Sequence, residues 1–169
     1  ATQVAINDRP SAVRYPRGSG PGAAVRQEMS ALPVGRSVTR REGRSGLAIL
    51  SFGVLLPAAL AAAEEQDATV IDMRFIKPLD ADAVLKLALR SSAIVTVEEN
   101  AVAGGAGSAV SELLHDKGVL LPMLQIGIPD RFIEHGTREE CLAAAGLDAA
   151  AVVLASDREV IRHAIVAMQ

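Results

Sequence analysis

The chain has 169 residues and a formal net charge of −3; 50% of its residues are hydrophobic, 22% are charged, and one is a cysteine. This length can bury a sizeable core in one or two domains, and a single thiol excludes an internal disulfide framework. Mild acidity and few aromatic residues argue against nucleic acid as a partner, because such binding needs basic groups and stacking rings. We therefore expect a cytoplasmic globular protein.

Two arginines stand close to the amino end. Arg14 and Arg17 flank Pro16, which fixes the bend, and Gly18 allows close backbone approach. We predict that this motif ends a short apolar strand with a cationic fork that binds a phosphate or carboxylate. The alternative is that the two arginines are solvated or ion-paired.

The next segment, residues 19–35, has a different composition. It contains Gly-Pro-Gly and Pro33 and shows no sustained hydrophobic period, which is typical of a linker. We predict that residues 1–18 are the end of a preceding domain and that residues 36–169 form a domain of their own.

Beyond the linker, apolar strands alternate with Ala/Leu-rich helical stretches, which is typical of an α/β sheet that is mostly parallel, with helices on both faces. An edge strand over 36–41 should pair antiparallel with the strand over 47–52 and complete five strands. The remaining strands are predicted over 69–72, 93–97 and 122–126, and helices over 55–66, 81–90 and 105–116. Capping boxes at Thr137–Glu140 and Ser156–Glu159 predict two more helices.

The uncharged stretch over 47–63 approaches the length of a membrane span. Gly53 interrupts it, and Pro57 suits the first turn of a helix. We therefore interpret this stretch as a buried strand followed by a helix, and expect no membrane partner.

A glycine-rich helix start follows Glu98 and Glu99. A helix amino terminus of this kind can bind an anion, but the two glutamates would repel a phosphate, and the glycine spacing fits neither a P-loop nor a dinucleotide fingerprint. We expect instead that the glycines allow close approach to a strand or a neighbouring subunit, and that both glutamates project at the carboxyl edge of the sheet.

The three histidines and the cysteine show no ligand pattern. His115 falls at a helix end, His135 in a loop and His163 in the last helix, so metal-ligand spacing is absent. Cys141 is expected to be a small buried hydrophobic group in a helix. We predict no metal site, no cofactor site and no catalytic residue in this chain.

Four segments occur together in one order: Ser11-Ala-Val-Arg-Tyr-Pro-Arg-Gly18, Asp72-Met-Arg-Phe-Ile-Lys-Pro-Leu-Asp80, Val95-Thr-Val-Glu-Glu-Asn100 with Gly104-Gly-Ala-Gly-Ser108, and Gly127-Ile-Pro-Asp-Arg-Phe132 with His135-Gly-Thr137. Together they resemble the carboxyl-terminal part of the 1-deoxy-D-xylulose-5-phosphate synthase family, from Arg9 to about Ala151. The segment with two glutamates and a glycine-rich helix start is shared more widely with transketolases and related decarboxylases.

The resemblance implies a transketolase C-terminal-domain fold within a homodimeric transferase that depends on thiamine diphosphate and Mg²⁺. It implies that pyruvate is decarboxylated and joined to D-glyceraldehyde 3-phosphate, giving a precursor of isoprenoids, thiamine and pyridoxal phosphate. The cofactor and metal would be bound by an amino-terminal portion outside this chain. In this family the second arginine of the motif, here Arg17, helps to hold the aldehyde's phosphate; Arg14 could be its partner or could brace the strand.

Two alternatives stay open. The chain could belong to the decarboxylase β subunit of a 2-oxoacid dehydrogenase complex or to another transketolase-like enzyme, or it could be a non-catalytic assembly module. By itself the chain is expected to be inactive and to support dimer and domain packing.

Overall fold

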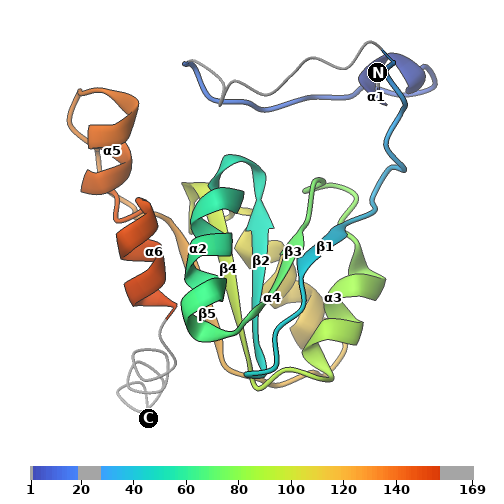
Figure 1. Ribbon diagram of the computed structural model, residues 1–169. Helices are drawn as coiled ribbons and strands as arrows, with labels where there is room; N and C mark the ends of the chain where they lie inside the picture. The colour runs from blue at the N-terminus through green and yellow to red at the C-terminus, as the bar shows by residue number, and fades with distance from the viewer. Residues whose placement is uncertain (1, 19–27, 157–169) are drawn as a thin grey trace.

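A single mixed sheet of five strands forms the centre of the computed structural model, which describes residues 2–18 and 28–156 (Figure 1). The strand order is β1-β3-β2-β4-β5. The strands are β1 (Val38–Arg41), β2 (Leu47–Phe52), β3 (Thr69–Asp72), β4 (Ala93–Ala101) and β5 (Met123–Ile128). Strands β3, β2, β4 and β5 are parallel, and β1 runs antiparallel at the edge. The predicted α/β sheet with one antiparallel edge strand is confirmed.

The predicted partner of the edge strand is wrong. β1 pairs with β3, not with β2, because β2 lies at the centre of the sheet with β3 and β4 hydrogen-bonded to its two sides. The connection from β1 therefore crosses the start of β3 before entering β2. Gly43 allows this crossing, since its backbone lies directly against Asp67 and Ala68 and its N–H donates to the Thr69 hydroxyl at 3.0 Å.

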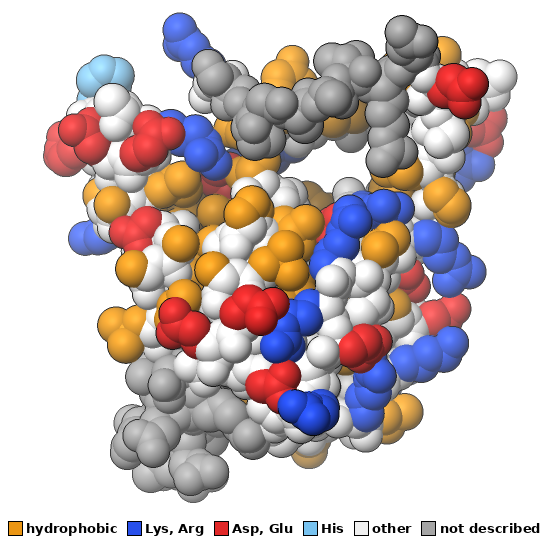
Figure 2. Space-filling model, in the orientation of Figure 1, with side chains coloured by type: hydrophobic (Ala, Val, Ile, Leu, Met, Phe, Trp, Pro, Cys, Tyr) orange, Lys and Arg blue, Asp and Glu red, His pale blue; other side chains and the backbone are white. Residues whose placement is uncertain are grey.

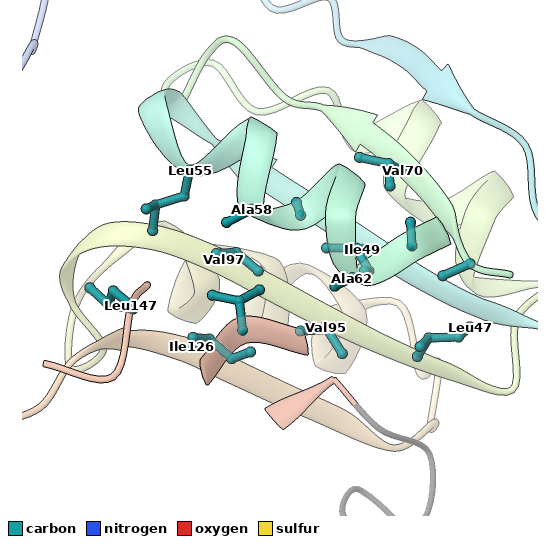
Figure 3. Close-up of a cluster of buried hydrophobic side chains, with 14 of the residues drawn as sticks. Leu47, Ile49, Leu55, Ala58, Ala62, Val70, Val95, Val97, Ile126 and Leu147 are labelled. Carbon is teal, nitrogen blue, oxygen red and sulfur yellow. The ribbon is translucent and has the colours of Figure 1, made fainter. Parts of the chain in front are cut away.

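Helices cover both faces of the sheet. The helices are α2 (Leu56–Gln66), α3 (Ala81–Ala88), α4 (Ala106–Asp116), α5 (Arg138–Ala144) and α6 (Ala149–Ala155), with a 3₁₀ turn, η1 (Gly53–Leu55), before α2. On one face, α2 and α6 pack with alternate residues of the strands, including Ile49, Val95 and Val97 (Figure 3). On the other face, α3 and α4 cover Leu50 and Ile94.

Local signals set several of these helix ends as predicted. Pro57 lies in the first turn of α2. The Asp80 carboxylate accepts the Ala83 N–H and caps α3. Thr137 and Glu140 form the predicted capping box that opens α5. The helix predicted from the capping box at Ser156–Glu159 lies outside the described residues.

The amino-terminal segment does not form the predicted strand. Thr2–Ala5 form the short helix α1, and the described residues from there to Gly18 are irregular. In Figure 1 this segment runs above the carboxyl ends of the parallel strands, from α1 towards α5. A strand needs a neighbouring strand that pairs with its backbone N–H and C=O groups. Among the described residues the sheet ends at β1 and β5, and the amino-terminal segment pairs with neither of them.

None of the helices within residues 2–18 and 28–156 has the length and apolar character needed to cross a membrane. The uncharged stretch over 47–63 folds as β2, the turn η1 and the start of α2, as the break at Gly53 predicts. Gly53 has a φ of +77°, a conformation that favours glycine.

Candidate functional site

The arginine motif lies on an exposed, irregular segment. Arg14 and Arg17 are both exposed, and Gly18 has a φ of +149°, a conformation that favours glycine. Among the described residues, neither arginine forms a hydrogen bond or an ion pair. Both guanidinium groups are therefore available to an anion, although no strand fixes them as a fork.

A third arginine lies next to this motif. A Cβ atom placed on Gly18 would be 3.9 Å from Cδ of Arg138, the first residue of α5. The Arg138 guanidinium donates to the Glu99 carboxylate at 3.4 Å. Its Nε atom is buried and has no hydrogen-bond partner among the described residues. The amino-terminal segment, β4 and α5 thus meet at the carboxyl edge of the sheet.

Glu98 does not project from that edge, contrary to our expectation. Its side chain is 3% exposed, and its two carboxylate oxygens each accept a hydrogen bond of 2.7 Å, from the N–H groups of Ala106 and Gly107. These amides are in the first turn of α4, where an external anion would otherwise bind. The protein's own carboxylate therefore occupies the helix terminus, and phosphate binding there is disfavoured.

The glycines of this helix start allow close approach to a strand, which was one of our two expectations for them. A Cβ atom on Gly107 would lie 2.5 Å from the Thr96 hydroxyl and 3.0 Å from the Gln125 side-chain oxygen. At Gly105 it would lie 2.6 Å from both carboxylate oxygens of Glu98. Side chains at either position would push α4 away from β4 and β5.

The loop between β3 and α3 is held by carboxylates at both ends. Asp72 accepts from Arg40 at 2.8 Å and lies 3.9 Å from Nε of Arg74. Asp80, 6% exposed, accepts from the backbone N–H and hydroxyl of Ser37 at 2.7 and 2.9 Å. Burial by itself would raise the pKa of Asp80, but these hydrogen bonds outweigh it and the pKa lies below its ordinary value.

Basic side chains gather along β1 and the loops beside it, where they alternate with acidic ones (Figure 2). Arg41 pairs with Glu64 and Asp67, each at 3.1 Å, and Arg90 pairs with Glu42 at 3.2 Å. These charges are therefore largely paired within the protein, and they offer an external anion less than the unpaired arginines of the amino-terminal segment.

The remaining reactive side chains do not assemble into a centre. His115 is in the last turn of α4 and His135 is exposed in a loop, whereas His163 lies outside the described residues. Cys141 is half-buried rather than fully buried, and its thiol contacts the Glu134 carbonyl at 3.6 Å. Within residues 2–18 and 28–156, no three His, Cys, Asp or Glu side chains are grouped to hold a metal ion.

These side chains do not fit thiamine diphosphate with its magnesium ion. Such a group needs oxygen ligands for the metal and free donors for the diphosphate. Glu98 already fills the amino terminus of α4, and Glu99 is paired with Arg138. We therefore derive no catalytic step through the cofactor from the described residues.

Sequence reasoning singled out Arg17 and both glutamates as candidates, and the role of Arg17 stays a prediction. It missed the contacts of Arg138 and the buried position of Glu98. Strand alternation was a usable signal for Glu98, because Val95 and Val97 face α2 and the next residue must then face α4. For Arg138 no local signal existed, since its partner Glu99 is 39 positions away.

Comparison with known proteins agrees with this architecture. Residues 35–152 match the family described as "Transketolase, C-terminal domain". A solved structure described as "Split gene transketolase, inactive beta4 tetramer" is similar with a TM-score of 0.69 and 33% identity, over 78% of this chain and 44% of that chain.

Curated relatives share a more specific likeness. The chain is 57% identical over 148 residues to 1-deoxy-D-xylulose-5-phosphate synthase of Thioalkalivibrio sulfidiphilus, 57% identical over 143 residues to that of Bordetella petrii, and 58% identical over 151 residues to that of Shewanella amazonensis. These matches cover 85% to 89% of this chain. They cover only 23% to 24% of each relative, so the chain spans about a quarter of their length.

The four sequence segments, the mixed sheet with helices on both faces and these matches agree with one another. The chain belongs to the family of transketolase C-terminal domains, and it matches the carboxyl-terminal portion of 1-deoxy-D-xylulose-5-phosphate synthases.

Proposed function

We propose that this chain is the carboxyl-terminal part of an enzyme that joins pyruvate to D-glyceraldehyde 3-phosphate with loss of CO₂, giving 1-deoxy-D-xylulose 5-phosphate. The observation that carries this proposal is the 57% identity to a synthase over 88% of the chain. The product would feed isoprenoid, thiamine and pyridoxal phosphate synthesis in the cytoplasm.

In this enzyme, thiamine diphosphate and Mg²⁺ would be bound by segments outside this chain. We propose that residues 1–18 are the end of the preceding, pyrimidine-binding domain, that 19–35 are a linker, and that 36–169 are the carboxyl-terminal domain. The domain would support a homodimer and pack against the rest of the enzyme.

Arg17 is proposed to bind the phosphate of the aldehyde. Its exposed guanidinium, on a segment above the carboxyl ends of the strands, supports this role (Figure 1). Each charge-assisted hydrogen bond to a phosphate oxygen would contribute about 1.5–3 kcal/mol once shielded from water. Pyruvate has no phosphate group, so its binding would not depend on Arg17. Arg14 is the second candidate, nearby on the same exposed segment.

The chain by itself is proposed to be inactive, with a role in assembly. The structural neighbour whose description reads "inactive beta4 tetramer" supports this view, since a related part of a transketolase is there described as inactive and assembled. Intact mass spectrometry with an assay of CO₂ release tests it. A lone 17.6 kDa species should release no CO₂ from pyruvate and D-glyceraldehyde 3-phosphate.

The main test uses a joined enzyme, in which this chain replaces the 148-residue matched segment of the Thioalkalivibrio sulfidiphilus relative. We expect the joined enzyme to form 1-deoxy-D-xylulose 5-phosphate, detected by mass spectrometry. A folded joined enzyme that binds thiamine diphosphate but yields no such product would contradict the proposal.

The role of Arg17 is tested in the same enzyme. Arg17→Ala should raise the KM for D-glyceraldehyde 3-phosphate by tenfold or more, the effect of about 1.4 kcal/mol, and change the KM for pyruvate much less. Arg9→Ala is the matched control, because Arg9 is exposed on the same segment and pairs with its neighbour Asp8. Equal effects of Arg17→Ala on both substrates would count against phosphate binding.

A further inference from the structure

The loop between β3 and α3 carries an arginine, Arg74, whose guanidinium forms no hydrogen bond with the described residues. We propose that Arg74 binds an acidic side chain of the enzyme's amino-terminal portion and so fastens that portion to the carboxyl edge of this domain. The inference rests on the proposed function only in that the chain is joined to such a portion. It does not depend on which reaction the enzyme catalyses.

The first support is an excess of positive charge at the end of β3. Oδ2 of Asp72 accepts from Nε and Nη2 of Arg40 at 3.2 and 2.8 Å, and it lies 3.9 Å from Nε of Arg74. Arg40 therefore occupies the acceptor oxygen, and one carboxylate faces two guanidinium groups. Lys77 is exposed in the same loop and has no ion pair among the described residues, so it adds to the excess. An acidic partner would balance this charge.

The second support is the state of Arg74 itself. Its side chain is 23% exposed, and its nitrogen atoms are not among the buried polar atoms that lack a partner. An external carboxylate can therefore reach the guanidinium, which offers five N–H donors. The backbone of Arg74 has a φ of +57°, in the left-handed region that residues other than glycine seldom adopt. Backbone strain of this kind is concentrated at functional sites.

The third support is the apolar surface around the loop. Large hydrophobic side chains are exposed after three of the four parallel strands: Val54 follows β2, Ile76 follows β3, and Phe132 follows β5. The carboxyl ends of parallel strands meet at one edge of the sheet, so these side chains lie on that edge with Arg74. Apolar side chains around an arginine are typical of the core of a protein interface.

The size of the relatives identifies the partner. The chain matches only about a quarter of the length of the synthases, at their carboxyl-terminal portion, so most of such an enzyme lies outside it. In Figure 1 the amino-terminal segment runs above the carboxyl edge, and α1 is on the side of β1 and β3. A portion joined through this segment would therefore lie against the edge that carries Arg74. A free anion would balance the charge but would leave the apolar side chains exposed.

Hydrogen–deuterium exchange of the joined enzyme and of the chain alone tests the inference without reference to activity. Backbone amides of residues 73–77 should exchange about tenfold more slowly in the joined enzyme, as expected for one added charge-assisted hydrogen bond. Arg74→Gln should remove most of this difference by speeding exchange in the joined enzyme, and should leave the chain alone unchanged. Unchanged exchange in β2 verifies that each variant is folded.

Two further variants separate this role from an internal one. Arg40→Gln is the matched control, because its partner Asp72 belongs to the chain itself, and it should change exchange in both proteins by the same factor. Arg74→Lys keeps the charge and should retain more of the slow exchange than Arg74→Gln does.

The inference is overturned if residues 73–77 exchange at the same rate in both proteins, or if Arg74→Gln speeds their exchange equally in both. It is also overturned if excess inorganic phosphate slows exchange of this loop in the chain alone and Arg74→Gln abolishes that effect, because the site would then bind a free anion. A joined enzyme that shows the predicted exchange but forms no product would contradict the proposed reaction and support this inference.

Discussion

Replacement of Glu98 tests the claim that the protein fills the amino terminus of α4 with its own carboxylate. Glu98→Gln keeps the size of the side chain but presents an N–H₂ group to one of the two amides that now donate at 2.7 Å. A hydrogen bond to a charged group contributes about 1.5–3 kcal/mol, and one such bond would be lost. Glu98→Ala leaves both buried amides without this acceptor, at about 1–3 kcal/mol for each.

We therefore expect Glu98→Gln to lower the free energy of unfolding by about 1.5–3 kcal/mol and Glu98→Ala by about 2–6 kcal/mol. Urea denaturation of the chain, followed by circular dichroism, measures both. Glu112→Gln is the matched control, because Glu112 is exposed on the same helix and should change the free energy by less than about 0.5 kcal/mol. Equal stabilities of Glu98→Gln and Glu112→Gln would refute the proposed cap.

Three further predictions concern stability in the same denaturation assay. Gly107→Ala should destabilise the chain by about 1–3 kcal/mol, because the new Cβ atom would lie 2.5 Å from the Thr96 hydroxyl. This cost should exceed the gain from the better helix propensity of alanine, and a stabilised variant would contradict the close packing of α4 on β4. The pKa of Asp80 is lower in the folded chain than its ordinary value of 3.8, so the stability that this carboxylate contributes is complete above pH 3.8 and is lost as the pH falls through the folded value. The destabilisation caused by Asp80→Asn should therefore shrink as the pH falls below 3.8. A destabilisation that grows on acidification would refute this account of Asp80. Thr137→Ala removes the cap of α5 and should cost about 1 kcal/mol, whereas Thr137→Ser should cost little; equal losses would count against the capping box.

The strands and most helices could be predicted because their signals are local. Short runs of Val, Ile, Leu and Ala marked β2 to β4, and Asp80 and Thr137 marked helix starts where the structure has them. The partner of β1 could not be predicted in this way. Its pairing with β3 depends on which strands occupy the two sides of β2, and that is a property of the whole sheet.

The site was predicted less completely than the fold. Four segments in one order carried the family likeness, because their combination is specific although each segment alone is common. The orientation of Glu98 depends on the packing of α4, and the pairing of Glu99 with Arg138 joins residues 39 positions apart. Such contacts depend on tertiary packing, which the hydrophobic periodicity of a short segment does not predict.

The acceptor dependence of CO₂ release by the joined enzyme tests the central claim most directly. Pyruvate is supplied with D-glyceraldehyde 3-phosphate in one reaction and with a lipoyl domain in the other, at equal enzyme concentration. Our account predicts CO₂ release that depends on D-glyceraldehyde 3-phosphate, falls on Arg17→Ala and is not supported by the lipoyl domain. Release that depends on the lipoyl domain, and is unaffected by the phosphorylated aldehyde, would contradict it and favour a 2-oxoacid dehydrogenase subunit.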